Sequence, residues 1–232
     1  MARDFDGTND NINYGTDASI DNFFSTGNAG TFAMWVERDA AAAAHALFNK
    51  TTTNAITAWA FRLNASDLAE FFHGFSTTFG QWSVASPTVG AAALTHLALT
   101  FDGLEASQPV IYINGTSAAV TEDTNSAGTA TADGASSLRS GEVGSALTQD
   151  FDGRQGWLCY GSTIWTADLV NRHKWWGVAP GGPSTVAVWH PFWTDGLTNK
   201  GTATANGTAT GTTVASLPRV ERMWGSMMGC GR

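Results

Sequence analysis

The sequence contains little charge, little cysteine and little proline. Only 14% of its 232 residues are charged, and it has two cysteines and six prolines. This composition matches neither intrinsically disordered chains nor coiled coils. Cys159 and Cys230 are too far apart in sequence to form a metal-binding motif. They are either two free thiols or one disulfide.

No apolar run approaches the roughly 18 residues of a membrane span. The first ten residues, MARDFDGTND, lack the basic and apolar regions of a signal peptide. The formal net charge of −8 disfavours binding to the phosphate backbone of nucleic acids. We therefore expect neither a membrane nor a nucleic acid as a partner.

Motifs of the common catalytic sites are also missing. The chain has no G-x-S-x-G, no H-E-x-x-H, no P-loop and no dinucleotide-binding fingerprint. The few glutamates do not form the E-x-D-x-x-E pattern of glycan-cleaving strands, and the five histidines are scattered. The sequence predicts a protein that is not an enzyme.

Alternating apolar and polar residues are the main pattern that is present. In THLALTF, Leu97, Leu99 and Phe101 share one face, while His96 and Ala98 share the other. About a dozen such segments are separated by turns rich in glycine, asparagine, serine and proline, including the hairpin signal Asn-Gly after PVIYI. This pattern indicates an all-β, two-sheet antiparallel β-sandwich.

One segment, TADLVNRHKWWG, predicts a short helix. Thr166 is suited to cap its N-terminus, and Gly177 is suited to end it. Its apolar stripe consists of Leu169, Val170, His173 and Trp176, which should face the core. The alanine-rich residues 39–46 are too short for an independent helix, so we expect a loop or a single turn there.

The end of the chain differs from the rest. Threonines alternate in residues 196–216, which favours an exposed β-ribbon with turns at Asn206-Gly207 and Gly211. Residues 217–232 then carry three arginines and one glutamate, a net charge of +2. Since the whole chain carries a net charge of −8, residues 1–216 carry a net charge of −10. An acidic body with a basic tail indicates an arm that contacts a partner.

The motif DFDG occurs twice, at residues 4–7 and 150–153, and FDG recurs at 101–103. The simplest interpretation is a turn in which the aspartate accepts hydrogen bonds from nearby backbone amides. The alternative is a calcium site, the one cofactor that we considered. Its ligands would be four carboxylates that meet across neighbouring strands, those of Asp4, Asp6, Asp150 and Asp152.

The order of these segments resembles the LamG-like, concanavalin A-like jelly-roll domains, and in particular the stand-alone copies in bacteriophage virion genes. The resemblance covers residues 4–177. It rests on six segments in order: FDGTNDNINYG, GTFAMWV, ALFNK, THLALTFDG, VIYING and FDGRQGWLCYGSTIWTADLVNRHKWWG. It implies a jelly-roll domain over residues 1–195, with its first strand beside a late one. Residues 196–232 would form a C-terminal extension.

The resemblance to phage copies implies a virion structural protein, most specifically a capsid decoration protein on the virion surface. Its partners would be the major capsid protein or sister copies, and we expect a homo-oligomer. Basic, methionine and tryptophan side chains of the tail suit such contacts. The candidate partner-binding residues are Arg219, Arg222, Met223, Trp224, Met227 and Met228.

The alternative function is carbohydrate binding, as a lectin-like module or a tail-associated adhesion protein for a cell-surface glycan. Ten tryptophans are many for a chain of this length. Four of them lie in strand patterns and should be buried, namely Trp35, Trp59, Trp157 and Trp165. The candidates for stacking on sugar rings are Trp175, Trp189 and Trp193.

Overall fold

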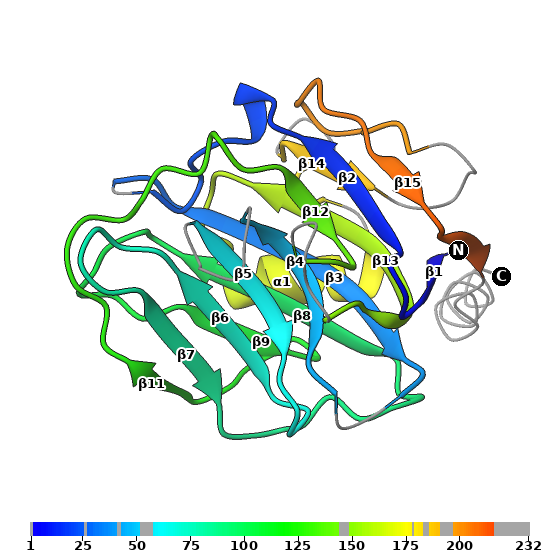
Figure 1. The fold of residues 1–232 in the computed structure, drawn as a ribbon, viewed down its shortest axis with the longest axis horizontal. Coiled ribbons are helices and arrows are strands. Elements are labelled where there is room, and N and C mark those ends of the chain that lie inside the picture. The colour runs from blue at the N-terminus through cyan, green and yellow to red at the C-terminus, as the bar shows by residue number, and fades with distance from the viewer. Residues whose placement is uncertain are drawn as a thin grey trace, which may run out of the picture.

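Short strands with alternating side chains assemble into two antiparallel sheets that pack face to face (Figure 1). The computed structural model describes residues 2–25, 27–40, 43–51, 58–143, 149–177, 179–182, 186–190 and 197–215. Within them lie sixteen strands, one α-helix and one short 3-10 helix. The predicted all-β sandwich with one short helix is therefore confirmed.

The first sheet, called sheet A, runs in the order β10-β9-β8-β3-β13-β1-β16, and β14 also pairs with β13. Its strands are β1 (Ala2–Asp6), β3 (Gly30–Arg38), β8 (Thr95–Phe101), β9 (Val110–Ile113), β10 (Thr116–Ser117), β13 (Asp152–Gly161), β14 (Val188–His190) and β16 (Thr213–Ala215). The turn between β9 and β10 contains Asn114 and Gly115 with φ of 53° and 82°, as the Asn-Gly signal predicts.

The second sheet, called sheet B, runs in the order β11-β7-β6-β5-β4-β12-β2-β15. Its strands are β2 (Asn11–Gly15), β4 (His45–Lys50), β5 (Trp59–Leu63), β6 (Ala69–His73), β7 (Gly80–Val84), β11 (Val120–Thr124), β12 (Leu138–Ser140) and β15 (Thr208–Thr210). Because β4 begins at His45, the described part of residues 39–46 adds no helix, in line with the predicted loop.

The main core fills the space between the two sheets. Leu97, Leu99 and Phe101 of β8 point into it, whereas Ala98 points to the opposite face of sheet A, as the alternation predicts. The core is rich in aromatic rings, which include the fully buried Trp59 and Trp82. Trp35, Trp157 and Trp165 are also buried, so the prediction for all four strand tryptophans is confirmed.

The helix α1 (Ala167–Trp176) packs on the outer face of sheet A and lies behind the sandwich in Figure 1. Thr166 caps its N-terminus through the Leu169 N–H, and Gly177 ends it in the left-handed conformation. Its buried residues are Val170 and His173. No described helix is long and apolar enough to cross a membrane.

The prediction that Trp176 lies in the buried stripe of the helix is wrong, because its side chain is 48% exposed. The indole of Trp157 occupies the space below the end of the helix. A Cβ at Gly177 would lie only 1.9 Å from Cε3 of Trp157. The last turn therefore cannot settle deeper on the sheet, and Trp176 remains at the surface.

The threonine-rich segment forms strands but not the predicted β-ribbon. β15 pairs with β2 in sheet B, whereas β16 pairs with β1 in sheet A. Gly211, with φ of 76°, lies between these two strands. Each strand finds its backbone partners at the edge of a different sheet, so the two do not pair with each other.

Candidate functional site

A hollow of about 610 Å³ lies beside the C-terminal end of α1. Trp176 and Arg172 line it from the helix, Trp189 lines it from β14, and residues 179–182 complete it. Two indole rings and one guanidinium therefore face a common space. Such a combination provides apolar faces together with a hydrogen-bond donor.

Backbone structure fixes both tryptophans at the hollow. Trp176 is the last residue of α1, and Gly177 turns the chain away directly after it. Trp189 lies in the middle of β14, opposite Cys159 of β13. The Trp189 N–H also donates to Oδ1 of Asn199 at 2.9 Å. The hollow is thus held by a helix end and a paired strand.

Arg172 provides the charge at the hollow. Its Nε lies 3.1 Å from Oδ2 of Asp168, one helical turn earlier, and its side chain is exposed. An exposed ion pair of this type is weak. The guanidinium is therefore available to donate to hydroxyl or carboxylate oxygens of a ligand, since it has five N–H groups.

The candidate stacking residues have different outcomes. Trp189 is half-buried and lines the hollow. Trp175 is exposed but does not line it, and the Nζ of Lys174 lies 4.7 Å from the centre of a Trp175 ring. Trp193 lies outside the described residues. The sequence interpretation assigned Trp176 to the buried stripe of the helix and did not single out Arg172 as a binding residue. The Trp-Trp-Gly end of the helix is the signal that could have pointed to Trp176.

The two DFDG copies do lie side by side, as the resemblance implies. In the pairing of β1 with β13, Asp4 faces Arg154 and Asp6 faces Asp152. The turn interpretation is confirmed for two of the three copies, since Oδ1 of Asp6 accepts from the Thr8 N–H and Oδ1 of Asp102 accepts from the Leu104 N–H.

The same carboxylates give the calcium hypothesis no support. Asp4 forms an ion pair with Arg154 at 3.5 Å, and Asp150 accepts from the Asn9 N–H. Among the described residues there is no group of three or more acidic, histidine or cysteine side chains that could hold a metal ion. Calcium binding by Asp4, Asp6, Asp150 and Asp152 stays a prediction.

A second, more polar hollow of about 470 Å³ lies where β15, β2 and β12 meet. Its lining includes the carboxamides of Asn11, Asn13 and Asn206, together with Arg139. Arg139 also forms an ion pair with Glu142 at 3.2 Å, while burial raises the pKa of that glutamate. Carboxamides provide both donors and acceptors, so this hollow suits a polar ligand.

The candidate arm residues of the tail lie outside the described residues. These are Arg219, Arg222, Met223, Trp224, Met227 and Met228. The last described strand, β16, pairs with β1 and thus ends next to the start of the chain. Residues 216–232 follow that strand.

Solved structures share the fold at low sequence identity. A protein from Bacteroides ovatus, described as a candidate carbohydrate binding protein, has a TM-score of 0.64 and 18% identity. The match covers 93% of this chain and 59% of that one, so this chain spans about three fifths of its length. A heptameric SAP-like pentraxin from Limulus polyphemus has a TM-score of 0.60 and 12% identity, covering 92% of this chain and 94% of that chain.

A third structure, the binding domain of the paraclostridial mosquitocidal protein 1, has a TM-score of 0.54 and 13% identity over 75% of this chain and 42% of that chain. No curated protein sequence matches this chain. The family model for laminin G domains of the concanavalin A-like lectin/glucanases superfamily matches residues 6–154, more than half of the chain. With two sheets in jelly-roll packing and a matching sequence pattern, the chain belongs to the concanavalin A-like lectin/glucanases superfamily.

Proposed function

We propose that this chain is a non-enzymatic binding module that recognises a glycan through the hollow formed by Trp176, Trp189 and Arg172. The observation that carries the proposal is the convergence of two indole rings on one space. The apolar face of a sugar ring stacks on an indole, and its hydroxyl groups need donors and acceptors beside that face. The guanidinium of Arg172 and the turn at residues 179–182 provide the polar groups.

The relatives in structure are consistent with this proposal. The Bacteroides ovatus protein is described as a candidate carbohydrate binding protein. The likeness itself concerns the fold, so the argument for this chain depends on its own hollow. Single exposed aromatic residues are common on protein surfaces, whereas several that line one hollow indicate a binding site.

A glycan array probed with the full chain, followed by calorimetry on the best ligand, tests the proposal. Trp176→Ala and Trp189→Ala should each weaken binding at least about tenfold, since each removes one stacking face. Trp175→Ala is the matched control, because this neighbouring exposed tryptophan does not line the hollow. If all three variants bound the glycan as tightly as the unmodified chain, or if no glycan on the array bound, this function would be rejected.

The second candidate function is capsid decoration, with the jelly roll on the virion surface and the tail engaged with the shell or a sister copy. It is favoured by the acidic body and the basic tail, and by the resemblance of the sequence to phage virion copies. The strand that precedes the tail in sequence, β16, pairs with β1 at one edge of sheet A. A basic arm on an acidic body can bind a surface that would repel the body.

Quantitative mass spectrometry of purified particles would test this second function. Near-equal copies of this chain and the main shell protein support decoration, whereas absence from the particles rejects it. Deleting residues 217–232 should abolish attachment and leave the thermal unfolding of the sandwich unchanged. Full attachment of the truncated chain would reject the role of the arm.

A further inference from the structure

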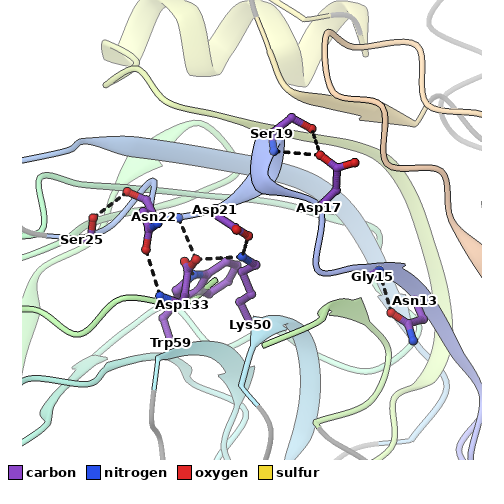
Figure 2. Close-up of polar contacts among 10 residues, drawn as sticks. All are labelled: Asn13, Gly15, Asp17, Ser19, Asp21, Asn22, Ser25, Lys50, Trp59 and Asp133. Carbon is purple, nitrogen blue, oxygen red and sulfur yellow. Dashed lines mark hydrogen bonds and ion pairs between the residues drawn. The ribbon is translucent and has the colours of Figure 1, made fainter. Parts of the chain in front are cut away.

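Lys50 is a buried lysine that contacts two carboxylates. It is the last residue of β4, and its side chain is fully buried. Its Nζ contacts Oδ1 of Asp21 and lies 2.8 Å from Oδ1 of Asp133. Figure 2 shows the lysine pointing between these two carboxylates, which come from the segment after Ile20 and from the loop before β12. Three distant segments of the chain thus meet at one amine.

A group of buried aromatic rings adjoins this cluster at Trp59, whose Nε1–H donates to Asp133. The ring of Trp59 lies 5.1 Å from that of Phe24, 5.5 Å from that of Phe48 and 5.6 Å from that of Tyr160. All four side chains are fully buried. Burial, and then the negative charges of Asp133 and Asp21, raise the pKa of Tyr160. In a site of such low polarity a charge without a partner is costly, so the lysine and its two carboxylates are held close together.

The two carboxylates differ in their contacts. Oδ1 of Asp133 accepts from the Asn22 N–H at 2.7 Å, and Oδ2 accepts from the Trp59 Nε1–H at 3.1 Å. Both of its oxygens are therefore held in place. The carboxylate of Asp21 forms an ion pair with Lys50, and its Oδ2 lies beside Gly134. Two donors besides Lys50 hold the oxygens of Asp133, so Asp21 is the better candidate to lose an oxygen and Asp133 the better candidate to carry a proton.

We propose that Lys50 and Asp21 form an intramolecular isopeptide bond, with Asp133 as the proton carrier. The Lys50 ammonium first transfers a proton through Asp133 to the Asp21 carboxylate, which leaves a neutral amine and a carboxylic acid. The nitrogen lone pair then attacks Cγ of Asp21 and forms the C–N bond. Asp133 accepts a second proton from that nitrogen and passes it to the departing hydroxyl. The Cγ–O bond breaks, one water molecule leaves, and Asp133 returns to its carboxylate form.

The position of the cluster suits both steps. Contact between the amine and the carboxyl group replaces a collision in solution, which greatly raises the effective concentration of the reacting groups. Asp21 is 14% exposed, so the water that forms is next to the surface. The finished amide would join η1 (Ala18–Ile20) to the end of β4 by a covalent bond.

Mass spectrometry of the full chain under unfolding conditions tests the proposal. The expected mass is lower than that of the sequence by one water molecule. An Asp-Gly succinimide loses water as well, so the location of the link must be shown. Trypsin does not cleave after an acylated lysine. The expected product is therefore peptide 4–38, which contains Asp21, joined to peptide 39–62, which is uncleaved at Lys50.

Two variants act as matched controls. Lys50→Arg keeps the positive charge but removes the reacting amine, so it should show the full sequence mass and separate peptides. Asp133→Asn keeps the amine and Asp21 but removes the proton carrier, and it should remain unlinked. Circular dichroism checks that both variants fold.

The wild-type chain decides the question without any variant. The full sequence mass together with a free peptide 39–50 would overturn the proposal. A link from Lys50 to peptide 63–139, which contains Asp133, would overturn the assignment of Asp21 as the acyl partner.

Discussion

Nε2 of His96 and Nδ1 of His173 lie 2.9 Å apart where β8 meets α1. Both imidazoles are fully buried. Burial lowers the pKa of both histidines, that of His173 to about 4, and the charge of Lys174 further lowers that of His96. One neutral ring therefore donates to the other, and this contact joins the helix to sheet A.

The buried histidines predict that the fold loses stability in mild acid. His73 is a third histidine of this kind, since burial lowers its pKa to about 4. Unfolded histidine titrates near pH 6.5, so between pH 6.5 and about 4 the unfolded chain binds more protons than the folded chain. The neutral histidines thus make their full contribution to the free energy of unfolding above pH 6.5, and this contribution is lost as the pH falls toward 4. For His73 alone, the shift of its pKa corresponds to roughly 3 kcal/mol in the free energy of unfolding.

Thermal unfolding at pH 7.5, 6 and 5 measures this effect, and Tm should fall by several degrees across the series. His173→Gln should reduce the dependence of Tm on pH, because it removes one titrating group. A Tm that is independent of pH over this range would show that the three imidazoles do not titrate on unfolding.

Gly177→Ala should destabilise the fold more than Gly15→Ala does. Both glycines have positive φ, 60° and 77°, so each substitution carries a backbone strain of about 1 kcal/mol. A Cβ at Gly177 would also collide with the ring of Trp157, whereas a Cβ at Gly15 would have no other atom within 4 Å. Urea unfolding should therefore show a loss of about 3 kcal/mol for Gly177→Ala and about 1 kcal/mol for Gly15→Ala. Equal losses would contradict the close packing of the helix end on Trp157.

Local patterns in the sequence predicted the sandwich and the helix because they depend on near neighbours. The alternation around Leu97 and Leu99 assigns one face to the core, and Thr166 and Gly177 cap the helix within a few residues. The glycan hollow was predicted only in part. Trp189 was a candidate, but the exposure of Trp176 depends on the ring of Trp157, about twenty residues away.

Pairings across long stretches of sequence were beyond local patterns. The threonines of β15 and β16 alternate equally well in a ribbon or at two sheet edges, so their partners β2 and β1 could not be chosen. Lys50 shares the inward face with Phe48 in the segment ALFNK, which is unusual for a lysine. The carboxylates that contact it are 29 and 83 residues away in sequence.

Cys159 should not react with thiol reagents in the folded protein. Its side chain is fully buried below α1, and burial raises the pKa of its thiol. Only the thiolate reacts, so both access and ionisation are limiting. In a Cys230→Ser variant, Ellman's reagent should label one thiol after unfolding in urea and almost none before. Rapid labelling of that variant without urea would contradict the burial of Cys159.

Arg38→Met should cost far more stability than Arg172→Met. The side chain of Arg38 is fully buried, and its Nη2 lies 2.9 Å from Oδ1 of Asp67, which is 21% exposed. Methionine fills similar space but leaves the partly buried Asp67 carboxylate without this charge, at a cost of about 3 kcal/mol. The Arg172–Asp168 pair is exposed on both sides, so its loss should cost less than about 0.5 kcal/mol. Urea unfolding of the two variants measures the difference. Similar losses would mean that the Arg38–Asp67 pair is as well hydrated as the pair on the helix.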